Sequence, residues 1–300
     1  MKAGVIGLGD MGSGIAKNLI KNGFTTYGFD LDESRLQAFT DGGGQGLGNA
    51  MAVGEQADAV FIMVMSGDQV NSVIFGEQGL LQTMKPGSVI ILSATINPAE
   101  ATSIGQRLDG SGIFFIDTPV SGGFPGAQNG TLTLMAAAPA DLLQTFSPVL
   151  EAVSANIHHV GTEPGMGQTV KACLQSLIGS VFSATYEASV LAAKAGVSGQ
   201  ALYDVFSTSA ASSGITNSSL EYIIDRKFEG TGSHIATMHK DLTISLAMAQ
   251  DLGVPLHTAS TAMQLFHAGK TKYPDSDNQV VTRVIEEIVG AQLHRKSKPG

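Results

Sequence analysis

The chain has 300 residues, enough for one large or two ordinary domains, and it is rather apolar, with 43% hydrophobic and 14% charged residues. A net charge of -9 argues against a nucleic-acid partner, since the only basic cluster in the sequence is the short tail HRKSKPG. No signal peptide is expected, because MKAGVIGLG reaches glycines before a long apolar region forms. No run of about 18 apolar residues predicts a membrane span.

Cysteine and histidine usage points to neither disulfides nor metal. The single Cys173 cannot form an internal disulfide, which favours a reducing cytoplasm as the compartment. Free cysteines usually behave as small core residues, so we expect Cys173 to be buried rather than nucleophilic. The histidines lack metal-site spacing: His234 and His239 are five residues apart, not the four of a helical zinc pair, and no metal is predicted.

The first half of the chain alternates short apolar runs with helix-like segments. The runs cover 3–7, 25–30, 59–64, 88–93 and 113–117, and the helix-like segments cover 11–23, 33–43, 66–76 and 97–108. This alternation predicts right-handed βαβ units and a mainly parallel sheet with helices on both faces. Residues 131–138 and 156–160 are predicted as further strands.

After GTEPGMG (161–167) the strand rhythm stops. One long helix is predicted from about 168 to 195, closed by Lys194 as a basic last turn and Gly196 as a stop. Its few charges predict that it is covered on most sides. Further helices are expected near 199–207, 216–226, 236–252, 256–269 and 278–292. The chain is therefore predicted to fold as an α/β domain followed by an all-α domain.

The stretch GVIGLGDMGSG places Gly7, Gly9 and Gly12 between the first strand and the first helix. In this context G-x-G-x-x-G favours a tight turn, close approach of backbone amides to a pyrophosphate, and helix-on-strand packing. The pyrophosphate would lie at the helix N-terminus, where amides and the dipole favour an anion. We therefore expect residues 7–12 to bind a dinucleotide: Gly7, Leu8, Gly9, Asp10, Met11 and Gly12.

Asp30 ends the second predicted strand, where a carboxylate can bind both ribose hydroxyls of the adenosine. A carboxylate there repels a 2′-phosphate, and the nearest arginine, Arg35, lies a turn into the next helix. The sequence thus predicts NAD rather than NADP as the cofactor. The alternative is an ordinary glycine-rich turn with a solvated Asp30.

Later strands end in VMS (64–66), SAT (93–95) and DTPVSGG (117–123), at the sheet edge where open parallel sheets bind ligands. We expect Met65 and Thr95 to contact the cofactor. Ser121, Gly122 and Gly123 offer a hydroxyl and approachable backbone amides for a substrate carboxylate. Ordinary strand-to-helix loops are the alternative interpretation.

In GQTVKACLQ (167–175), Lys171 and Gln175 are four residues apart and share one helix face, with short or apolar neighbours. Burial disfavours the charged form of a lysine and lowers its pKa, so Lys171 could exchange a proton with a substrate hydroxyl. The alternative is a snorkelling lysine or an ion-pair partner.

Four motifs, in this order and spacing, resemble the β-hydroxyacid dehydrogenases over about residues 1 to 290. They are GLGDMGSGIAKNLIKNG, DTPVSGGFPGAQNGTLTLMA, GMGQTVKACLQ and HKDLTISLA. The resemblance implies a Rossmann NAD-binding domain over 1–163 and an all-α substrate and oligomerisation domain over 164–295, joined by a long interdomain helix. It also implies a homodimer or homotetramer and oxidation of a short hydroxy acid with NAD.

The usual family signature has a lysine followed by asparagine four residues on, but this chain has Gln175. That glutamine resembles the L-threonate dehydrogenase branch, as do VIFGEQGL, PVLEAVSANIHHVGTEPGMGQTVK and LHTASTAMQLF. The resemblance implies that Lys171 is the general acid–base group and Gln175 a substrate ligand. It further implies that Lys240 lies near the nicotinamide side of the cofactor and that Asp241 helps position the substrate site.

Other interpretations stay open. The substrate could be that of 3-hydroxyisobutyrate dehydrogenase or of tartronate semialdehyde (2-hydroxy-3-oxopropionate) reductase. From a different class, the chain could be a non-catalytic NAD-binding protein or an imine reductase, although retained Lys171 and Lys240 argue against both. Lys240 and Asp241 could form only an exposed ion pair. The serine-rich stretch 212–219 could offer Asn217 to a polyol tail or be an ordinary loop.

Overall fold

The computed structural model describes residues 1–296, and the chain divides into two compact units, Met1–Lys171 and Ala172 onward. The division falls inside the long helix α9 (Met166–Lys194), a few residues after the predicted domain boundary between 163 and 164. The last four residues of the basic tail, 297–300, lie outside the described residues. The predicted fold class, an α/β unit followed by an all-α unit, is confirmed.

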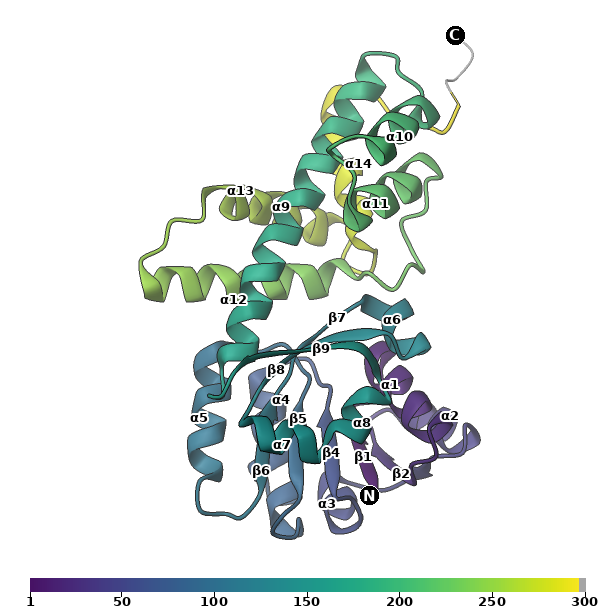
Figure 1. Cartoon of the computed structure of the whole chain (residues 1–300). Coiled ribbons are helices and arrows are strands. Elements are labelled where there is room, and N and C mark those ends of the chain that lie inside the picture. Colours follow the sequence, from purple (N-terminus) through teal and green to yellow (C-terminus); the bar gives the residue numbers. More distant parts are fainter. Residues whose placement is uncertain (297–300) are drawn as a thin grey trace. The chain divides into compact units, whose positions relative to one another are not determined.

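The N-terminal unit is built on one sheet of strand order β3-β2-β1-β4-β5-β6-β8-β7, with β9 paired to β8 (Figure 1). From β3 to β6 all pairs are parallel, β8 runs antiparallel to β6 and β7, and β9 is parallel to β8. The strands are β1 (Ala3–Ile6), β2 (Thr26–Phe29), β3 (Gln45–Gly46), β4 (Ala59–Ile62), β5 (Val89–Leu92), β6 (Phe114–Asp117), β7 (Val120–Ser121), β8 (Leu132–Ala137) and β9 (Ser154–Gly161).

All seven predicted strands are present, and the two that the sequence missed, β3 and β7, have two residues each. Such short strands carry no periodicity and form because neighbouring strands offer them hydrogen bonds. From β1 the chain continues to β2 and β3 on one side of this strand, and then crosses to β4 on its other side. The carboxyl edge beside β1 is therefore a topological switch point. Ligands of open α/β sheets bind at such points.

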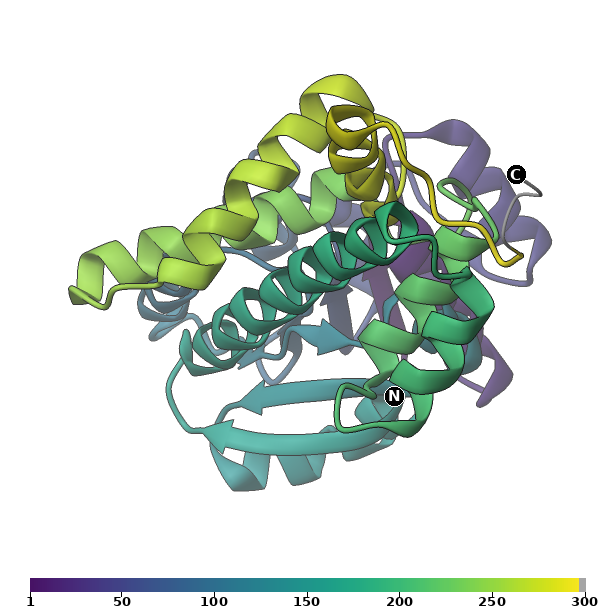
Figure 2. The ribbon, with the colours of Figure 1, turned by 90° about the horizontal axis from the view of Figure 1, so that it is seen from above.

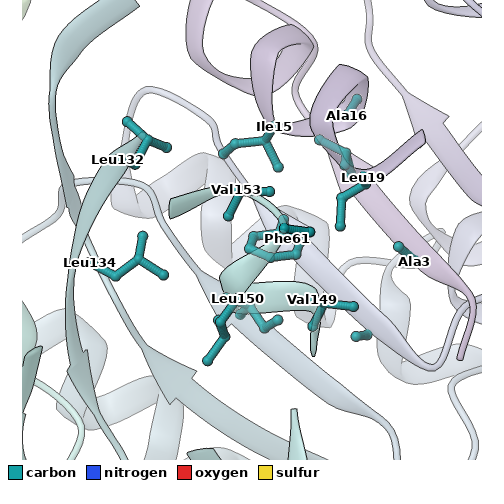
Figure 3. Packing of buried hydrophobic residues seen from close by; sticks show 14 of the residues in the cluster. Ala3, Ile15, Ala16, Leu19, Phe61, Leu132, Leu134, Val149, Leu150 and Val153 are labelled. Carbon is teal, nitrogen blue, oxygen red and sulfur yellow. The ribbon is translucent and has the colours of Figure 1, made fainter. Parts of the chain in front are cut away.

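Helices cover both faces of this sheet. They are α1 (Asp10–Lys21), α2 (Glu33–Asp41), α3 (Ala50–Gln56), α4 (Gly67–Phe75), η1 (Leu80–Gln82), α5 (Pro98–Leu108), α6 (Gly123–Asn129), α7 (Ala140–Thr145) and α8 (Ser147–Glu151). Successive strand residues point to opposite faces. Phe61 therefore packs in one core, with Ile15, Leu19 and Val149 (Figure 3), while Ile62 packs in the other. Each fully buried side chain of this size contributes about 1.5–3 kcal/mol.

The C-terminal unit is all helical. Besides the rest of α9 it contains α10 (Gly199–Thr208), α11 (Gly214–Ile224), α12 (Ile235–Leu252), α13 (His257–Lys272), η2 (Asn278–Val280) and α14 (Val281–Val289). Helices α12 and α13 lie side by side (Figures 1 and 2). Its core is centred on Tyr186, Phe182 and Phe266, whose rings lie 5.8 to 6.4 Å apart.

One expectation about α9 is wrong, because Cys173 is exposed rather than buried. The helix is covered on most sides, as its few charges predict, apart from one exposed stripe on which Leu177 is 62% and Leu191 72% exposed. Composition does not reveal which residues form such a stripe. Within residues 1–296, none of the helices is long and apolar enough to cross a membrane.

Candidate active site

The glycine loop follows β1 in a conformation that only glycine adopts easily. Gly7 has φ +88°, and a Cβ there would overlap the carbonyl oxygen of Met63 at the end of β4. A Cβ at Gly12 would overlap the carbonyl oxygen of Gly7, so helix α1 approaches β1 as closely as backbone allows. A Cβ at Gly9, by contrast, would meet only the guanidinium of Arg35, 3.6 Å away. The loop is therefore tight on its sheet side and roomy at Gly9.

Gly9 is the N-cap of α1, and within residues 1–296 no side chain caps this helix. The first-turn amides and the positive end of the helix dipole therefore suit an anion. Together with the roomy face at Gly9, this arrangement fits the pyrophosphate of a dinucleotide. The residues that would hold it are those predicted from the sequence, 7 to 12.

Asp30 lies just after β2 and is fixed by the glycine loop itself. Its Oδ2 accepts from the Leu8 amide at 2.6 Å and its Oδ1 accepts from the Asp32 amide at 2.9 Å. Its position beside the loop fits a role in binding ribose hydroxyls. Arg35, one turn into α2, reaches back to within 3.9 Å of Asp30 Oδ2. The sequence analysis placed Arg35 too far along the chain to act beside Asp30, whereas in the structure its guanidinium lies near the Asp30 carboxylate.

The remaining predicted cofactor residues of the N-terminal unit follow neighbouring strands. Met65 follows β4, is exposed, and its amide donates to Gln69 Oε1 at 2.8 Å. Thr95 follows β5 and is half-buried. The parallel register aligns Ile6, Ile62 and Leu92 at the ends of β1, β4 and β5, so the loops that follow these strands leave one edge of the sheet.

The predicted carboxylate cradle lies between β7 and α6. Gly122 has φ +127° and Gly123 has φ +58°, so the chain turns from Ser121 into α6 through backbone that favours glycine. Helix α6 packs on α1: the Asn18 amide donates to the carbonyl oxygen of Ala127 at 2.8 Å. The structure thus brings the element after the cradle against the helix that begins at the glycine loop, although the two motifs are about a hundred residues apart.

Lys171 belongs to the N-terminal unit and is 7% exposed. Its Nζ donates to the carbonyl oxygen of Val120 at 2.8 Å, next in sequence to Ser121. The ammonium therefore lies beside the predicted cradle, in a geometry that suits proton exchange with a group held there.

Gln175 and Asp241 meet within the C-terminal unit. Gln175 follows Lys171 by one turn of α9, and its Nε2 donates to Asp241 Oδ2 at 2.5 Å. Asp241 is 3% exposed, and Lys240 Nζ lies 3.2 Å from its other oxygen. A carboxylate only accepts hydrogen bonds, so the NH2 group of the Gln175 amide, and not its carbonyl oxygen, faces Asp241. The carbonyl oxygen of Gln175 then points away from Asp241.

Two groups of predicted polar residues remain. Asn217 lies in α11, and its Nδ2 donates to Ser212 Oγ at 3.1 Å within its own serine-rich stretch. His239 and His267 pair across α12 and α13 at 2.8 Å, a contact that no sequence pattern indicated. Over residues 1–296, no group of three or more metal-ligand side chains could hold a metal ion.

Sequence reasoning assigned no role to Asp117 or Gln168, although both lie inside the quoted motifs. Each is fully buried, and Gln168 Nε2 donates to Asp117 Oδ1 at 2.9 Å. The available signal was chemical: a carboxylate at the end of an apolar strand and an amide at the start of an apolar helix both need buried partners.

Comparisons with known proteins show the family of the chain. Residues 2–161 match the family model described as the NAD binding domain of 6-phosphogluconate dehydrogenase. Residues 165–285 match the one described as NAD-binding of NADP-dependent 3-hydroxyisobutyrate dehydrogenase. The chain is 36% identical to L-threonate dehydrogenase of Escherichia coli O6:H1, over 95% of both chains. The chain belongs to the β-hydroxyacid dehydrogenase family.

Other members of this family are similar over the same length. The 2-(hydroxymethyl)glutarate dehydrogenase of Eubacterium barkeri is 32% identical over 98% of this chain and 97% of its own. The crystal structure of 3-hydroxyisobutyrate dehydrogenase from Salmonella typhimurium superposes with a TM-score of 0.87 at 32% identity, covering 95% of this chain and 99% of that one. As a β-hydroxyacid dehydrogenase, the chain is an NAD-dependent oxidoreductase of CH–OH groups, which confirms the predicted enzyme class and cofactor.

Proposed function

We propose that this dehydrogenase oxidises a four-carbon sugar acid, such as L-threonate, at C2 to the 2-oxo acid, with Lys171 as the general acid–base group. The observation that carries the proposal is the buried Lys171 ammonium, held at the Val120 carbonyl oxygen beside Ser121. A lysine in such a place needs a function, because burial of an ammonium is costly. The 36% identity to an L-threonate dehydrogenase supports the choice of acid.

The proposed chemistry divides between three groups of side chains. The Ser121 hydroxyl and the amides of Gly122 and Gly123 hold the substrate carboxylate. In oxidation the neutral amine of Lys171 takes the proton from the C2 hydroxyl and becomes an ammonium, and in the reverse direction this ammonium donates the proton to the carbonyl oxygen. The nicotinamide, when bound, supplies the hydride acceptor that side chains lack. Its proposed binding residues are Gly7, Leu8, Gly9, Asp10, Met11, Gly12, Asp30, Met65, Thr95 and Lys240.

Gln175 is the proposed specificity residue. Because Asp241 accepts from its Nε2, the carbonyl oxygen of Gln175 is the atom left to meet a ligand. A carbonyl oxygen accepts a hydrogen bond from a hydroxyl and gains nothing from a methyl group. This orientation supports a polyhydroxy acid over 3-hydroxyisobutyrate, the substrate of the main alternative. Tartronate semialdehyde reduction is the second alternative, and a non-catalytic NAD-binding protein or an imine reductase would leave the buried Lys171 without a role.

The proposal includes a homodimer or homotetramer in the cytoplasm. Exposed apolar side chains on the helical unit, Leu177, Leu191 and Ile288, support self-association. The cytoplasmic location rests on the single cysteine.

The decisive experiment assays purified wild-type protein with NAD against L-threonate, other four-carbon aldonates, 3-hydroxyisobutyrate and tartronate semialdehyde. Lys171→Ala should lower kcat on the best substrate by a factor on the order of 10² to 10⁴, the usual range for a general acid–base group. Lys194→Ala is the matched control, because Lys194 Nζ also donates to a carbonyl oxygen, that of Val289, at the other end of α9. A preference for 3-hydroxyisobutyrate over every aldonate would contradict the proposed substrate, and a fully active Lys171→Ala enzyme would contradict the proposed mechanism.

A further inference from the structure

A buried polar cluster at the start of α9 lies outside the residues proposed to bind the substrate and the cofactor or to transfer the proton. Asp117, the last residue of β6, and Gln168, in the first turn of α9, both have 0% exposure. Buried carboxylates and amides are costly unless their hydrogen-bonding groups are satisfied. Their partners therefore indicate what they are for.

Asp117 joins the end of the sheet to the start of the helix. Its Oδ2 accepts from the Gly165 amide at 2.9 Å and from the Gln168 amide at 3.2 Å. Its Oδ1 accepts from Gln168 Nε2 at 2.9 Å. The carboxylate thus satisfies first-turn amides that have no partner inside the helix, at the helix end that favours negative charge.

Gln168 extends the same network to the neighbouring strand. Its Nε2 also donates to the Ala94 carbonyl oxygen at 3.0 Å, and its Oε1 accepts from the Ile96 amide at 3.1 Å. Both residues lie in the loop that follows β5. One side chain therefore ties the first turn of α9 to the ends of two adjacent strands, β5 and β6.

Glycines make this junction close. A Cβ at Gly167 would lie 2.6 Å from the Met135 carbonyl oxygen and 2.8 Å from that of Asp117. Gly165 has φ +98°, and a Cβ there would lie 2.5 Å from Thr102 Oγ1. The helix start is pressed against the strand ends, so its position is set by contacts on several sides.

Lys171 follows Gln168 by three residues and shares its helix face. Its Nζ ends on the Val120 carbonyl oxygen, three residues after Asp117 along the chain. The hydrogen bonds of Asp117 and Gln168 thus fix the backbone that carries Lys171 relative to the chain segment that carries its acceptor, the Val120 carbonyl oxygen. We infer that Asp117 and Gln168 are positioning residues that set Lys171 for proton transfer; this rests on the function proposed above for Lys171.

The test removes the network while keeping side-chain size. Gln168→Met should lower kcat by about 10²-fold, the loss expected when a catalytic group is misplaced by about 1 Å. NADH affinity, measured by fluorescence titration, should stay within about twofold, as for distant sites. Asp117→Asn is the second variant, because its amide turns a donor toward the N–H groups that the carboxylate accepted from. Thr169→Ala is the matched control: the Thr169 hydroxyl donates to the carbonyl oxygen of Gly165, just before α9, and within residues 1–296 not to Asp117 or Gln168.

Combination with Lys171→Ala separates positioning from mere stability. If Gln168 acts through Lys171, adding Gln168→Met to Lys171→Ala should change the residual rate by less than about twofold. A further large fall in that background would overturn the inference, since it would mean that Gln168 acts on something else. An impaired Lys171→Ala enzyme beside a fully active Gln168→Met enzyme would contradict this inference alone. A fully active Lys171→Ala enzyme would instead contradict the proposed function.

A second readout needs no turnover. Competitive acetylation followed by mass spectrometry reports the reactivity of each lysine in the folded protein. Lys171 should react several-fold faster in Gln168→Met than in wild type, because its ammonium is no longer held at Val120, while Thr169→Ala should match wild type. Equal labelling of Lys171 in wild type and Gln168→Met would overturn the inference.

Discussion

At the scale of single residues, three carboxylates hold predicted site residues or the segments next to them by accepting hydrogen bonds. Asp30 accepts from the glycine loop, Asp117 from the first turn of α9, and Asp241 from Gln175. An ionised carboxylate accepts hydrogen bonds and donates none, so each fixes which group faces it. The consequences differ because the partners differ: the glycine loop, a helix start and the side-chain amide of the proposed specificity residue.

Asp30 and Arg35 should together set the cofactor preference. We expect the wild-type enzyme to use NAD better than NADP by a factor of about ten or more, since repulsion of about 1.4 kcal/mol suffices. Asp30→Ala should reduce this preference for NAD, because Arg35 loses one of its two carboxylate partners, the other being Asp32, and its Nη1 can meet a 2′-phosphate. Steady-state kcat/KM with both cofactors measures this. The companion variant Arg35→Ala should leave NAD use nearly unchanged, and equal use of both cofactors by wild type would contradict the interpretation of Asp30.

Asp117 should make folding stability fall as pH rises. Burial raises the pKa of Asp117 from 3.8 to about 6, despite the amides that hydrogen-bond to it. The native state then binds more protons than the unfolded state between about pH 4 and pH 6, so this contribution to the free energy of unfolding is full below that window and is lost through it. Its size is about 3 kcal/mol, from about 1.4 kcal/mol for each pKa unit.

Urea denaturation at several pH values measures that change as the difference between wild type and Asp117→Asn. The comparison removes other groups, such as Asp32 and Asp225, whose pKa values are lowered by hydrogen bonds from Ser34 and Arg295. A wild-type advantage that stays constant across the window would show that Asp117 ionises in the folded state as in the unfolded one.

At the scale of elements, α9 carries Lys171 and Gln175 on successive turns but anchors them differently. The turn with Lys171 is held by the strand ends of the N-terminal unit. The turn with Gln175 is held by α12, where Gly179 lets the helices approach: a Cβ there would lie 2.7 Å from Leu242. One helix therefore carries the proposed proton-transfer group and the proposed specificity group, each fixed by its own unit.

Gln175→Asn should alter substrate choice while leaving NAD binding intact. Wild type should favour L-threonate over 3-hydroxyisobutyrate by about tenfold or more, because a site built for hydroxyls is left with unpaired polar groups by an analogue that lacks them. Asparagine is one methylene shorter, so its carbonyl oxygen would lie farther from the hydroxyl of the L-threonate tail. The ratio of kcat/KM for L-threonate to kcat/KM for 3-hydroxyisobutyrate should therefore fall. An unchanged ratio would mean that Gln175 does not contact the substrate tail.

At the scale of the whole molecule, large apolar side chains of the helical unit are exposed in the single chain. Leu191 is 72% and Ile288 79% exposed, and Leu191 lines a groove together with Glu187, Val190, Lys194, Ile285 and Val289. A second copy of this chain would cover that surface at little entropic cost, since the side chains lie on regular helices.

Light scattering after size exclusion should therefore find an oligomer for wild type. Leu191→Glu, which buries an unpaired charge in such an interface, should shift the equilibrium toward monomer. Leu31→Glu is the control, because Leu31 is 86% exposed in the N-terminal unit. A wild-type monomer at micromolar concentration would rule out the proposed homo-oligomer.

Features that depend on local pattern could be predicted from the amino-acid sequence. Apolar runs of strand length alternating with helical segments predicted the sheet, because side-chain periodicity reports burial directly. The glycine loop could be recognised since its strand and helix are adjacent in the chain, and Lys171 could be singled out by its apolar surroundings.

Contacts between distant segments depend on how the elements pack and could not be predicted from local pattern. Gln168 meets Asp117 across 51 residues, Gln175 meets Asp241 across 66, and neither pairing leaves a trace in local periodicity. Side-chain placement is likewise not set by local pattern: Arg35 Nη1 lies 3.9 Å from Asp30 Oδ2, and Cys173 is exposed. Composition sets how many groups must be buried or paired, whereas the packing of the elements selects their partners.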